Sequence, residues 1–366
     1  EAGTGTGKTI AYLAPAALSE KRVVVSTGTR NLQEQIFFKD LVLLGRAFGC
    51  GLRAAILKGQ ENYLCLRRLD ALVRSPAVLG FAPREIEELL AWAGATATGD
   101  RAEVSWLADD APLWREVCST AETRIGPRCP EHDRCFVTRA RQEAQRASII
   151  VVNHHLYFAD LSAKADGGNG VLPRHDAVVF DEAHLIEDVA TEFFSIKVSS
   201  SRVERLLDDA VKTVSPAAVG RDDAKKLEKL AKRARTESSR FFGAFRILDV
   251  GRVKLELSEL QPEANERYFQ LDAALDAVES SLRARSGNDE SIFHLADRCR
   301  ELRTDLAEIL DGRGTKALVR WMERKARSTA LGASPIDIAE PFRKGVLFEI
   351  PSVVLTSATL STGGDF

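Results

Sequence analysis

The sequence contains no run of about eighteen apolar residues, so it predicts no membrane-spanning helix. Charge of one sign is not in excess either, because 51 lysine and arginine residues stand against 53 aspartate and glutamate residues, for a net charge of −2. A cationic surface over the whole molecule is therefore excluded, and any contact with nucleic acid must use local basic patches and backbone amides. Tandem repeats are also absent. The 366 residues, with 45% hydrophobic side chains, predict a soluble globular chain with roughly two or three cores.

The chain begins with EAGTGTGKT, the pattern of a phosphate-binding loop. Glycines in such a loop let backbone N–H groups point at the β- and γ-phosphates, while Lys8 reaches the same oxygens and the Thr9 hydroxyl helps to hold Mg²⁺. Ala2 stands at the usual first glycine, a variant associated with helicase-type motors. The apolar segment that follows predicts a helix whose N-terminus favours phosphate. The predicted ATP contacts are Gly3, Gly5, Thr6, Gly7, Lys8 and Thr9, with Lys8 also catalytic.

The tetrapeptide DEAH at 181–184 follows AVVF, an apolar run typical of a buried parallel strand. Its carboxylates therefore fall at the carboxyl end of a strand, where α/β proteins bind ligands. We expect Asp181 to hold Mg²⁺ together with Thr9, and Glu182 to orient and deprotonate the attacking water. The alternative, an acidic surface turn, is disfavoured by the phosphate loop upstream. His184 is a candidate sensor of bound DNA.

Three further segments predict strands of the same sheet. SVVLTSATL, at 352–360, ends in Ser357 and Thr359, whose hydroxyls can hydrogen-bond to the acidic turn and form with His184 a predicted coupling set. VVVSTGTRNLQEQI, at 23–36, predicts a strand and a helix joined by a turn where DNA phosphates could bind. SIIVVNHHLYFADL, at 148–161, predicts another strand and helix, and we interpret His154 and His155 within it as structural. The predicted DNA-binding residues are Thr27, Arg30 and Asn31.

Five of the six cysteines lie in or beside an insertion at about 59–146. Disulfides are improbable in a cytosolic ATPase, which leaves buried single thiols, a zinc site or an iron–sulfur cluster. The last two cysteines of this segment flank the polar loop PEHDR, of the kind that wraps a metal centre, and this favours a metal over unrelated thiols. The five cysteines are Cys50, Cys65, Cys118, Cys129 and Cys135.

A second insertion, at about 191–349, is mostly helical by its periodicity. Two apolar stripes at helical spacing predict packing faces. Their members are Leu271, Leu275, Val278 and Leu282, then Leu295, Cys299, Leu302, Leu306 and Ile309. Cys299 is therefore interpreted as a buried core thiol rather than a ligand. The sequence as a whole predicts an α/β fold, a doubly wound parallel sheet with two insertions.

The chain resembles the DinG/YoaA branch of the XPD-like superfamily 2 DNA helicases. The resemblance rests on six segments in the family's order: EAGTGTGKT, STGTRNLQEQ, KGQENYLCLRRL, CPEHDRCFVTRARQEAQRASIIVVNHHL, DEAH and LTSATL. It implies a RecA-like first motor domain, interrupted by a small cysteine-rich domain with a [4Fe–4S] cluster and by a mostly helical arch domain. It also implies a motor that hydrolyses ATP with Mg²⁺, moves 5′ to 3′ along single-stranded DNA and unwinds duplexes in repair or replication.

The resemblance divides the chain into parts. We expect the first motor domain at 1–58, 147–190 and 350–366, the iron–sulfur-type cysteine domain at 59–146 and the arch-like insertion at 191–349. A second motor domain is absent from the chain, so the fragment alone is expected to be inactive. The implied partners are single-stranded DNA, forked duplexes and replication or repair proteins. The implied state is a cytoplasmic monomer, associated with the nucleoid when on DNA.

One position departs from the family pattern, because Arg124 stands where the family has a cysteine. A guanidinium is always protonated and cannot bind iron. Three outcomes are open: Cys118 replaces the missing ligand, three thiolates hold the cluster, or the cluster is lost. We favour the first, which makes the predicted metal ligands Cys65, Cys118, Cys129 and Cys135.

Two other functions fit parts of the sequence. A DEAH-type RNA helicase would be stimulated by RNA and contain no iron, and the cysteine-rich insertion argues against it. A nucleotide- and metal-binding scaffold without turnover is disfavoured by the intact Lys8, Thr9, Asp181 and Glu182.

Overall fold

The computed structural model divides the chain into two compact units. Unit 1 comprises Glu1–Phe193 and Ile338–Phe366, and unit 2 comprises Phe194–Asp337. The structure describes residues 7–49, 51–75, 80–108, 110–120, 123–165, 170–214, 220–245, 251–256, 262–286, 289–310, 318–325 and 328–358. Within these ranges no helix is both long and apolar enough to cross a membrane.

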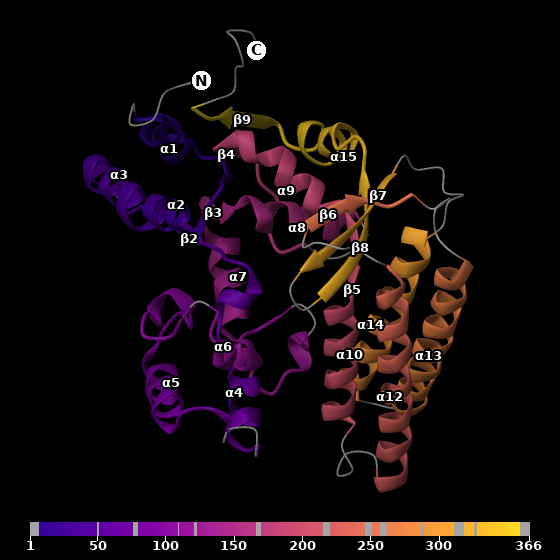
Figure 1. The fold of residues 1–366 in the computed structure, drawn as a ribbon. Coiled ribbons are helices and arrows are strands. Elements are labelled where there is room, and N and C mark those ends of the chain that lie inside the picture. The colour runs from indigo at the N-terminus through magenta and orange to yellow at the C-terminus, as the bar shows by residue number, and fades with distance from the viewer. Residues whose placement is uncertain are drawn as a thin grey trace. The chain divides into compact units, whose positions relative to one another are not determined.

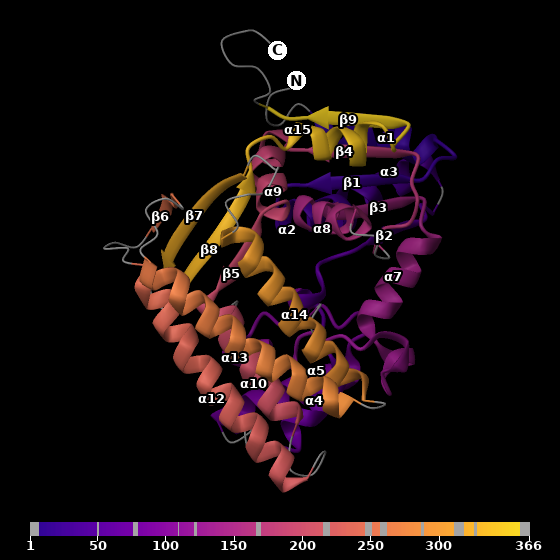
Figure 2. The ribbon, with the colours of Figure 1, turned by 90° about the vertical axis from the view of Figure 1, so that its right-hand side faces the viewer.

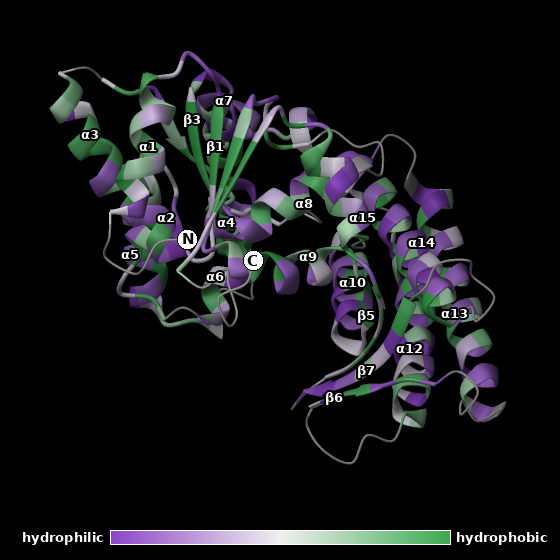
Figure 3. Ribbon diagram, turned by 90° about the horizontal axis from the view of Figure 1, so that it is seen from above, coloured by the Kyte–Doolittle hydropathy of each residue, from purple (hydrophilic) through white to green (hydrophobic). Residues whose placement is uncertain are grey.

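Unit 1 is built on a five-stranded parallel sheet in the order β2-β3-β1-β4-β9 (Figures 1 and 2). The strands are β1 (Val23–Thr27), β2 (Ala54–Ile56), β3 (Ile149–Asn153), β4 (Ala177–Asp181) and β9 (Ser352–Thr356). All five residues of β1 are buried, and Figure 3 colours β1 and β3 as hydrophobic. Because parallel strands covered on both faces read as continuous apolar runs, the sequence could identify β1, β3 and β4. Strand β9 is equally apolar and was predicted too, although it is largely exposed. The α/β fold with a parallel sheet is confirmed.

Alternating residues of the strands face two different layers. Val179 packs with Tyr12 and Leu13 of α1 (Lys8–Leu18) and with residues of η1 (Ile36–Asp40) and α3 (Leu41–Phe48). Its neighbour Phe180 faces the other side, where its ring lies 4.9 Å from that of Tyr157 and 5.9 Å from that of Phe342. These two rings belong to α8 (His154–Ala165) and α15 (Ala339–Phe342). Helices therefore cover both faces of the sheet, as in a doubly wound fold.

Three short elements follow strands at the carboxyl edge of the sheet: α2 (Arg30–Gln35) after β1, and η7 (Ala183–Leu185) and α9 (Ile186–Phe193) after β4. A fourth, η9 (Arg343–Leu347), precedes β9 and leads into its amino end.

The cysteine-rich segment of unit 1 is mainly helical, as expected. Its two isolated β-bridges pair Tyr63 with Asp100 and Leu64 with Cys118, so that distant parts of the segment meet beside Cys65. Its elements are η2 (Gln60–Asn62), α4 (Leu66–Val73), α5 (Pro83–Ala95), η4 (Arg101–Glu103), α6 (Pro112–Val117), η5 (Gly126–Arg128), η6 (His132–Arg134) and α7 (Phe136–Arg146).

Unit 2 combines four long helices with an antiparallel sheet that the helical periodicity did not predict. The helices are α10 (Ser200–Thr213), α12 (Arg221–Ala244), α13 (Pro262–Ser286) and α14 (Glu290–Leu310). The sheet has the order β5-β8-β7-β6, with β5 (Ile196–Ser199), β6 (Gly251–Lys254), β7 (Leu318–Lys325) and β8 (Ser328–Pro335). Both predicted stripes are buried in the core of this unit. Cys299 is fully buried, its Sγ donates to the Leu275 carbonyl oxygen, and burial raises the pKa of its thiol to about 12, which confirms a core thiol.

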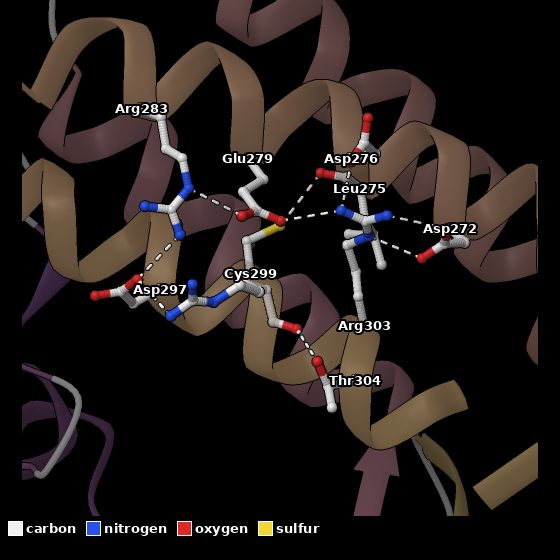
Figure 4. A network of polar contacts seen from close by, with 10 residues as sticks. Asp272, Leu275, Asp276, Glu279, Arg283, Asp297, Cys299, Arg303 and Thr304 are labelled. Carbon is white, nitrogen blue, oxygen red and sulfur yellow. Dashed lines mark hydrogen bonds and ion pairs between the residues drawn. The ribbon is translucent and has the colours of Figure 1, made fainter. Parts of the chain in front are cut away.

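A polar network joins α13 to α14 beside this thiol (Figure 4). Arg303 binds both carboxylate oxygens of Asp272, at 2.8 and 3.2 Å, and also contacts Glu279 at 3.0 Å. Glu279 accepts a further hydrogen bond from Arg283, which reaches Asp297 on the facing helix. Since Glu279 is only 8% exposed, its charge depends on these two arginines.

Candidate active site

The predicted phosphate loop ends in a left-handed backbone conformation that glycine adopts more easily than other residues. Gly7 has φ 84°, and Lys8 follows it as the first residue of α1. The Lys8 ammonium is buried and has no hydrogen-bond partner among the described residues. A buried cation is costly unless an anion balances it, so the position fits a site that a phosphate completes. Gly3, Gly5 and Thr6 lie outside the described residues.

Asp181 lies at the carboxyl end of β4 within electrostatic reach of Lys8. Burial raises the pKa of its carboxyl and the negative charge of Glu182 raises it further, while the positive charge of Lys8 acts in the opposite direction. Only 5% of Asp181 is exposed. The loop lysine and the first acidic residue of the DEAH turn therefore share one site, with Thr9 next to Lys8 on the same helix. Hydroxyl and carboxylate oxygens are ligands that hard divalent cations prefer, so Thr9 and Asp181 together are suited to hold such a cation.

Tyr12 belongs to this site, although the sequence analysis did not identify it. Burial is the main cause that raises the pKa of its phenol, and the nearby Asp181 carboxylate adds to the rise. The hydroxyl is buried and makes no hydrogen bond among the described residues, but Thr9 and Asp181 are both close enough to influence its pKa. Tyr12 follows Lys8 by one helical turn, so the two side chains lie on the same face of α1. This i, i+4 spacing was the signal that could have identified it.

Glu182 has an unusual backbone conformation. Its φ of 57° is the only positive φ at a non-glycine residue in the described part of the chain. Such conformations cost free energy and collect at functional sites. The turn that follows places Glu182 Oε2 3.4 Å from the imidazole Nδ1 of His184.

The predicted coupling residues His184 and Ser357 are in direct contact. His184 Nδ1 lies 2.8 Å from Ser357 Oγ. Strand β9 makes this possible, because it pairs with β4 and sets Asp181 opposite Thr356. Thr359, the third predicted member, lies outside the described residues.

The predicted DNA-binding turn is only partly accessible. Arg30 and Asn31 are exposed at the start of α2, where Thr29 caps the helix by accepting a hydrogen bond from the Leu32 N–H at 3.3 Å. Thr27, however, is fully buried at the end of β1. Of the three predicted contacts, only Arg30 and Asn31 therefore present their side chains to solvent.

Three of the four predicted metal ligands line one pocket. Cys65, Cys129 and Cys135 surround it together with Arg124, whose Nη2 donates to Thr138 Oγ1 at 3.2 Å. Arg124 thus lines the same pocket as the three cysteines. We call these three thiols with Arg124 the cysteine pocket.

Cys118 does not line the cysteine pocket. It pairs with Leu64 in an isolated β-bridge, and its buried Sγ contacts the Arg115 carbonyl oxygen at 3.9 Å. Burial is the main cause that raises the pKa of its thiol, and the nearby Cys65 thiol adds to the rise. Replacement of the missing ligand by Cys118, favoured from the sequence, stays a prediction.

The described residues that line the pocket therefore do not include a fourth thiol. Three thiols and a permanently charged guanidinium line the pocket. In the described part of the chain, no group of three or more histidine, cysteine, aspartate or glutamate residues is arranged to hold a metal ion.

Comparison with known proteins finds relatives along the whole chain. The family model DEAD_2 matches residues 119–203. The chain is 33% identical over 372 aligned residues to the ATP-dependent DNA helicase YoaA of Haemophilus influenzae, covering all of this chain and 57% of that protein. It is 30% identical over 398 aligned residues to the ATP-dependent helicase DinG of Mycobacterium tuberculosis, again covering all of this chain and 57% of the relative. A solved structure, Truncated XPD, aligns with 99% of this chain and 88% of its own at 15% identity, with a TM-score of 0.44.

Proposed function

Because this chain is related over its whole length to the YoaA and DinG proteins, we propose that the protein to which it belongs is an ATP-dependent DNA helicase. The chain spans 57% of the length of these two relatives. The proposed motor hydrolyses ATP, moves 5′ to 3′ along single-stranded DNA and opens duplexes during repair or replication. The observation that carries the proposal is the shared site of Lys8 and Asp181 beside the contact between His184 and Ser357.

In the proposed mechanism, Lys8 and the backbone N–H groups at the start of α1 bind the phosphates of ATP. Thr9 and Asp181 would hold Mg²⁺, which neutralises charge on the transferred phosphate group when bound. Glu182, fixed in its left-handed conformation, orients and deprotonates the attacking water. The buried position of Asp181 keeps bulk water away from the charged groups and strengthens their interactions.

The His184–Ser357 contact supports a route from hydrolysis to movement. His184 Nδ1 lies near both the Glu182 carboxylate and the Ser357 hydroxyl. One ring nitrogen cannot form its best hydrogen bond with both partners at once, so a movement of Glu182 alters the bond to Ser357. Strand β9 would carry this change to the part of the protein that follows it.

The proposed partners are single-stranded DNA and forked duplexes, bound by a monomer in the cytoplasm. Arg30 and Asn31 are the exposed side chains that would contact phosphates at the β1–α2 turn. Replication or repair proteins are proposed as further partners. We assign no step to an iron–sulfur cluster, because Arg124 takes a ligand position in the cysteine pocket.

The test uses the complete protein, with ATP hydrolysis measured in the absence and presence of single-stranded DNA. We expect stimulation by DNA, and a loss of about 100-fold or more in hydrolysis for Lys8→Ala and Glu182→Gln. Partial duplexes with a 5′ or a 3′ overhang then report the direction of movement. Stimulation by RNA alone, or hydrolysis that survives Glu182→Gln, would contradict the proposal.

A further inference from the structure

His154 links the carboxyl ends of three adjacent strands. It directly follows β3, and its Nδ1 lies 2.7 Å from the Oγ of Ser26 on β1. Ser26 is paired with Phe180 of β4, whose ring lies 5.9 Å from the imidazole. Both His154 and Ser26 are fully buried. A polar pair in such a place needs a reason beyond packing, since apolar side chains would fill the space at lower cost.

The second ring nitrogen of His154 faces the acidic turn. Its Nε2 is buried and has no hydrogen-bond partner among the described residues. Burial lowers the pKa of the imidazole to about 4, while the backbone groups of Glu182 and Asp181 act in the opposite direction. In the tautomer in which Nδ1 accepts from the Ser26 hydroxyl, the ring proton is on Nε2 and faces the backbone of the acidic turn.

The turn after β1 packs against the same acidic turn. A Cβ atom built on Gly28 would overlap the Leu185 Cδ1 methyl group and lie 3.6 Å from the Cβ of Glu182. No side chain therefore separates the β1–α2 turn from the DEAH turn. Arg30 and Asn31, exposed on the far side of this turn, begin two residues after Gly28.

We propose that His154 is a positioning residue that couples nucleic-acid binding at the β1–α2 turn to Glu182. The inference rests on the proposed function and adds a residue and a route to it. A DNA strand bound at Arg30 and Asn31 shifts the β1–α2 turn. Because Gly28 of this turn packs against the acidic turn, the acidic turn moves as well. His154, held by Ser26, then donates its Nε2–H to the backbone carbonyl of Asp181 or Glu182. This hydrogen bond forms only when DNA is bound, so it stabilises the DNA-bound arrangement relative to the DNA-free one.

The experiment measures ATP hydrolysis by the complete protein without DNA and with saturating oligodeoxythymidine. His154→Phe keeps a ring and removes both nitrogens, whereas Ser26→Ala removes only the hydroxyl that holds the ring. For both variants we expect the ratio of stimulated to basal kcat to fall about fivefold or more, with basal kcat unchanged. His154→Gln, which retains an N–H donor, is expected to recover part of the ratio.

His155→Phe is the matched control, because the neighbouring ring is half exposed and packs against Phe193 instead of the strand ends. It should leave the ratio within about twofold of the parent value. An unchanged ratio in His154→Phe and Ser26→Ala, or equal losses of basal and stimulated kcat, would overturn the inference. If His154→Phe does not fold, Ser26→Ala decides alone. A parent protein without DNA stimulation would instead refute the proposed function.

Discussion

His184 Nδ1 and Ser357 Oγ lie 2.8 Å apart, although 173 residues separate them in the sequence. Their contact joins the end of β4, where the DEAH turn begins, to the end of β9. A hydrogen bond therefore connects the DEAH turn, which carries the proposed hydrolytic residues, with the residue that directly follows β9.

Removing this bond should separate hydrolysis from unwinding. We expect Ser357→Ala in the complete protein to retain most DNA-stimulated ATP hydrolysis and to lose about fivefold or more of the base pairs opened per ATP. Parallel assays of phosphate release and strand separation give this ratio. Ser352→Ala, at the exposed start of the same strand, is the control and should not change it. If both variants open the same number of base pairs per ATP, the His184–Ser357 contact does not couple hydrolysis to unwinding.

Tyr12 should influence magnesium through Asp181. Its buried hydroxyl lies close enough to Asp181 for the carboxylate to raise the pKa of the phenol, and groups beside a metal ligand commonly change metal affinity by about 10-fold or more. Tyr12→Phe is therefore expected to raise the half-saturating Mg²⁺ concentration for ATP hydrolysis about tenfold. Tyr157→Phe removes a buried hydroxyl on the opposite face of the sheet, where its partner is His175, and serves as the control. Equal magnesium curves for both variants would count against this position for Tyr12.

His154 should make the fold sensitive to acid. Its pKa falls from 6.5 to about 4 in the folded chain, so unfolded chains bind a proton in this interval that folded chains reject. Burial of the neutral His154 therefore lowers the free energy of unfolding only below pH 6.5, and this loss grows as the pH falls toward 4. Between pH 7 and pH 5 the loss is about 2 kcal/mol, or roughly 5 °C in Tm. Thermal unfolding of the parent and of His154→Gln at both pH values should show this difference, and parallel losses would contradict it.

The arginine network of unit 2 should contribute more to stability than a surface pair on the same helix. Arg303→Ala leaves the buried Glu279 and also Asp272 without their main partner, which we expect to cost about 2 kcal/mol. Arg300 is 63% exposed on α14 and binds Asp297 at 3.2 Å. Arg300→Ala should cost about 0.5 kcal/mol or less. Denaturant unfolding followed at unit 2 compares the two variants, and similar costs would show that the network adds little.

The cysteine pocket predicts the metal content. With Arg124 in place, anaerobically purified protein should lack a [4Fe–4S] cluster, because only three thiols line the pocket. Arg124→Cys should restore the fourth thiol and introduce iron, sulfide and visible absorbance. Cys118→Ser is the control and should not change the result, since Cys118 is not among the residues that line the pocket. Iron and sulfide in the parent at four per chain would refute this reading of the pocket.

The motor sheet could be predicted from sequence because its four longer strands are apolar on both faces. The fifth, β2, has only three residues and gives too short a signal. The sheet of unit 2 was missed for a related reason. The strand LVRWMERK mixes charged and apolar residues, so its pattern does not indicate a half-buried strand. It pairs with β8 only two residues later, but the linking residues 326–327 contain no glycine or asparagine to indicate a hairpin. Its other partner, β6, lies far away in sequence.

Some features of the candidate sites could likewise be predicted from the sequence, and others could not. Lys8, Asp181, His184 and Ser357 carry their chemistry in short motifs, and the structure brings them to one edge of the sheet. The direction of Cys118 depends on its pairing with Leu64 across half of the insertion, which spacing cannot reveal. The burial of Thr27 likewise depends on which strands flank β1.

The late position of β9 in the chain has a consequence for biosynthesis. This strand completes the sheet beside β4, yet all of unit 2 is encoded between the two. During translation, β4 must wait with one edge unpaired until the ribosome has made the whole of unit 2. The hydrogen bond between His184 and Ser357 can therefore form only after the whole of unit 2 has been synthesised.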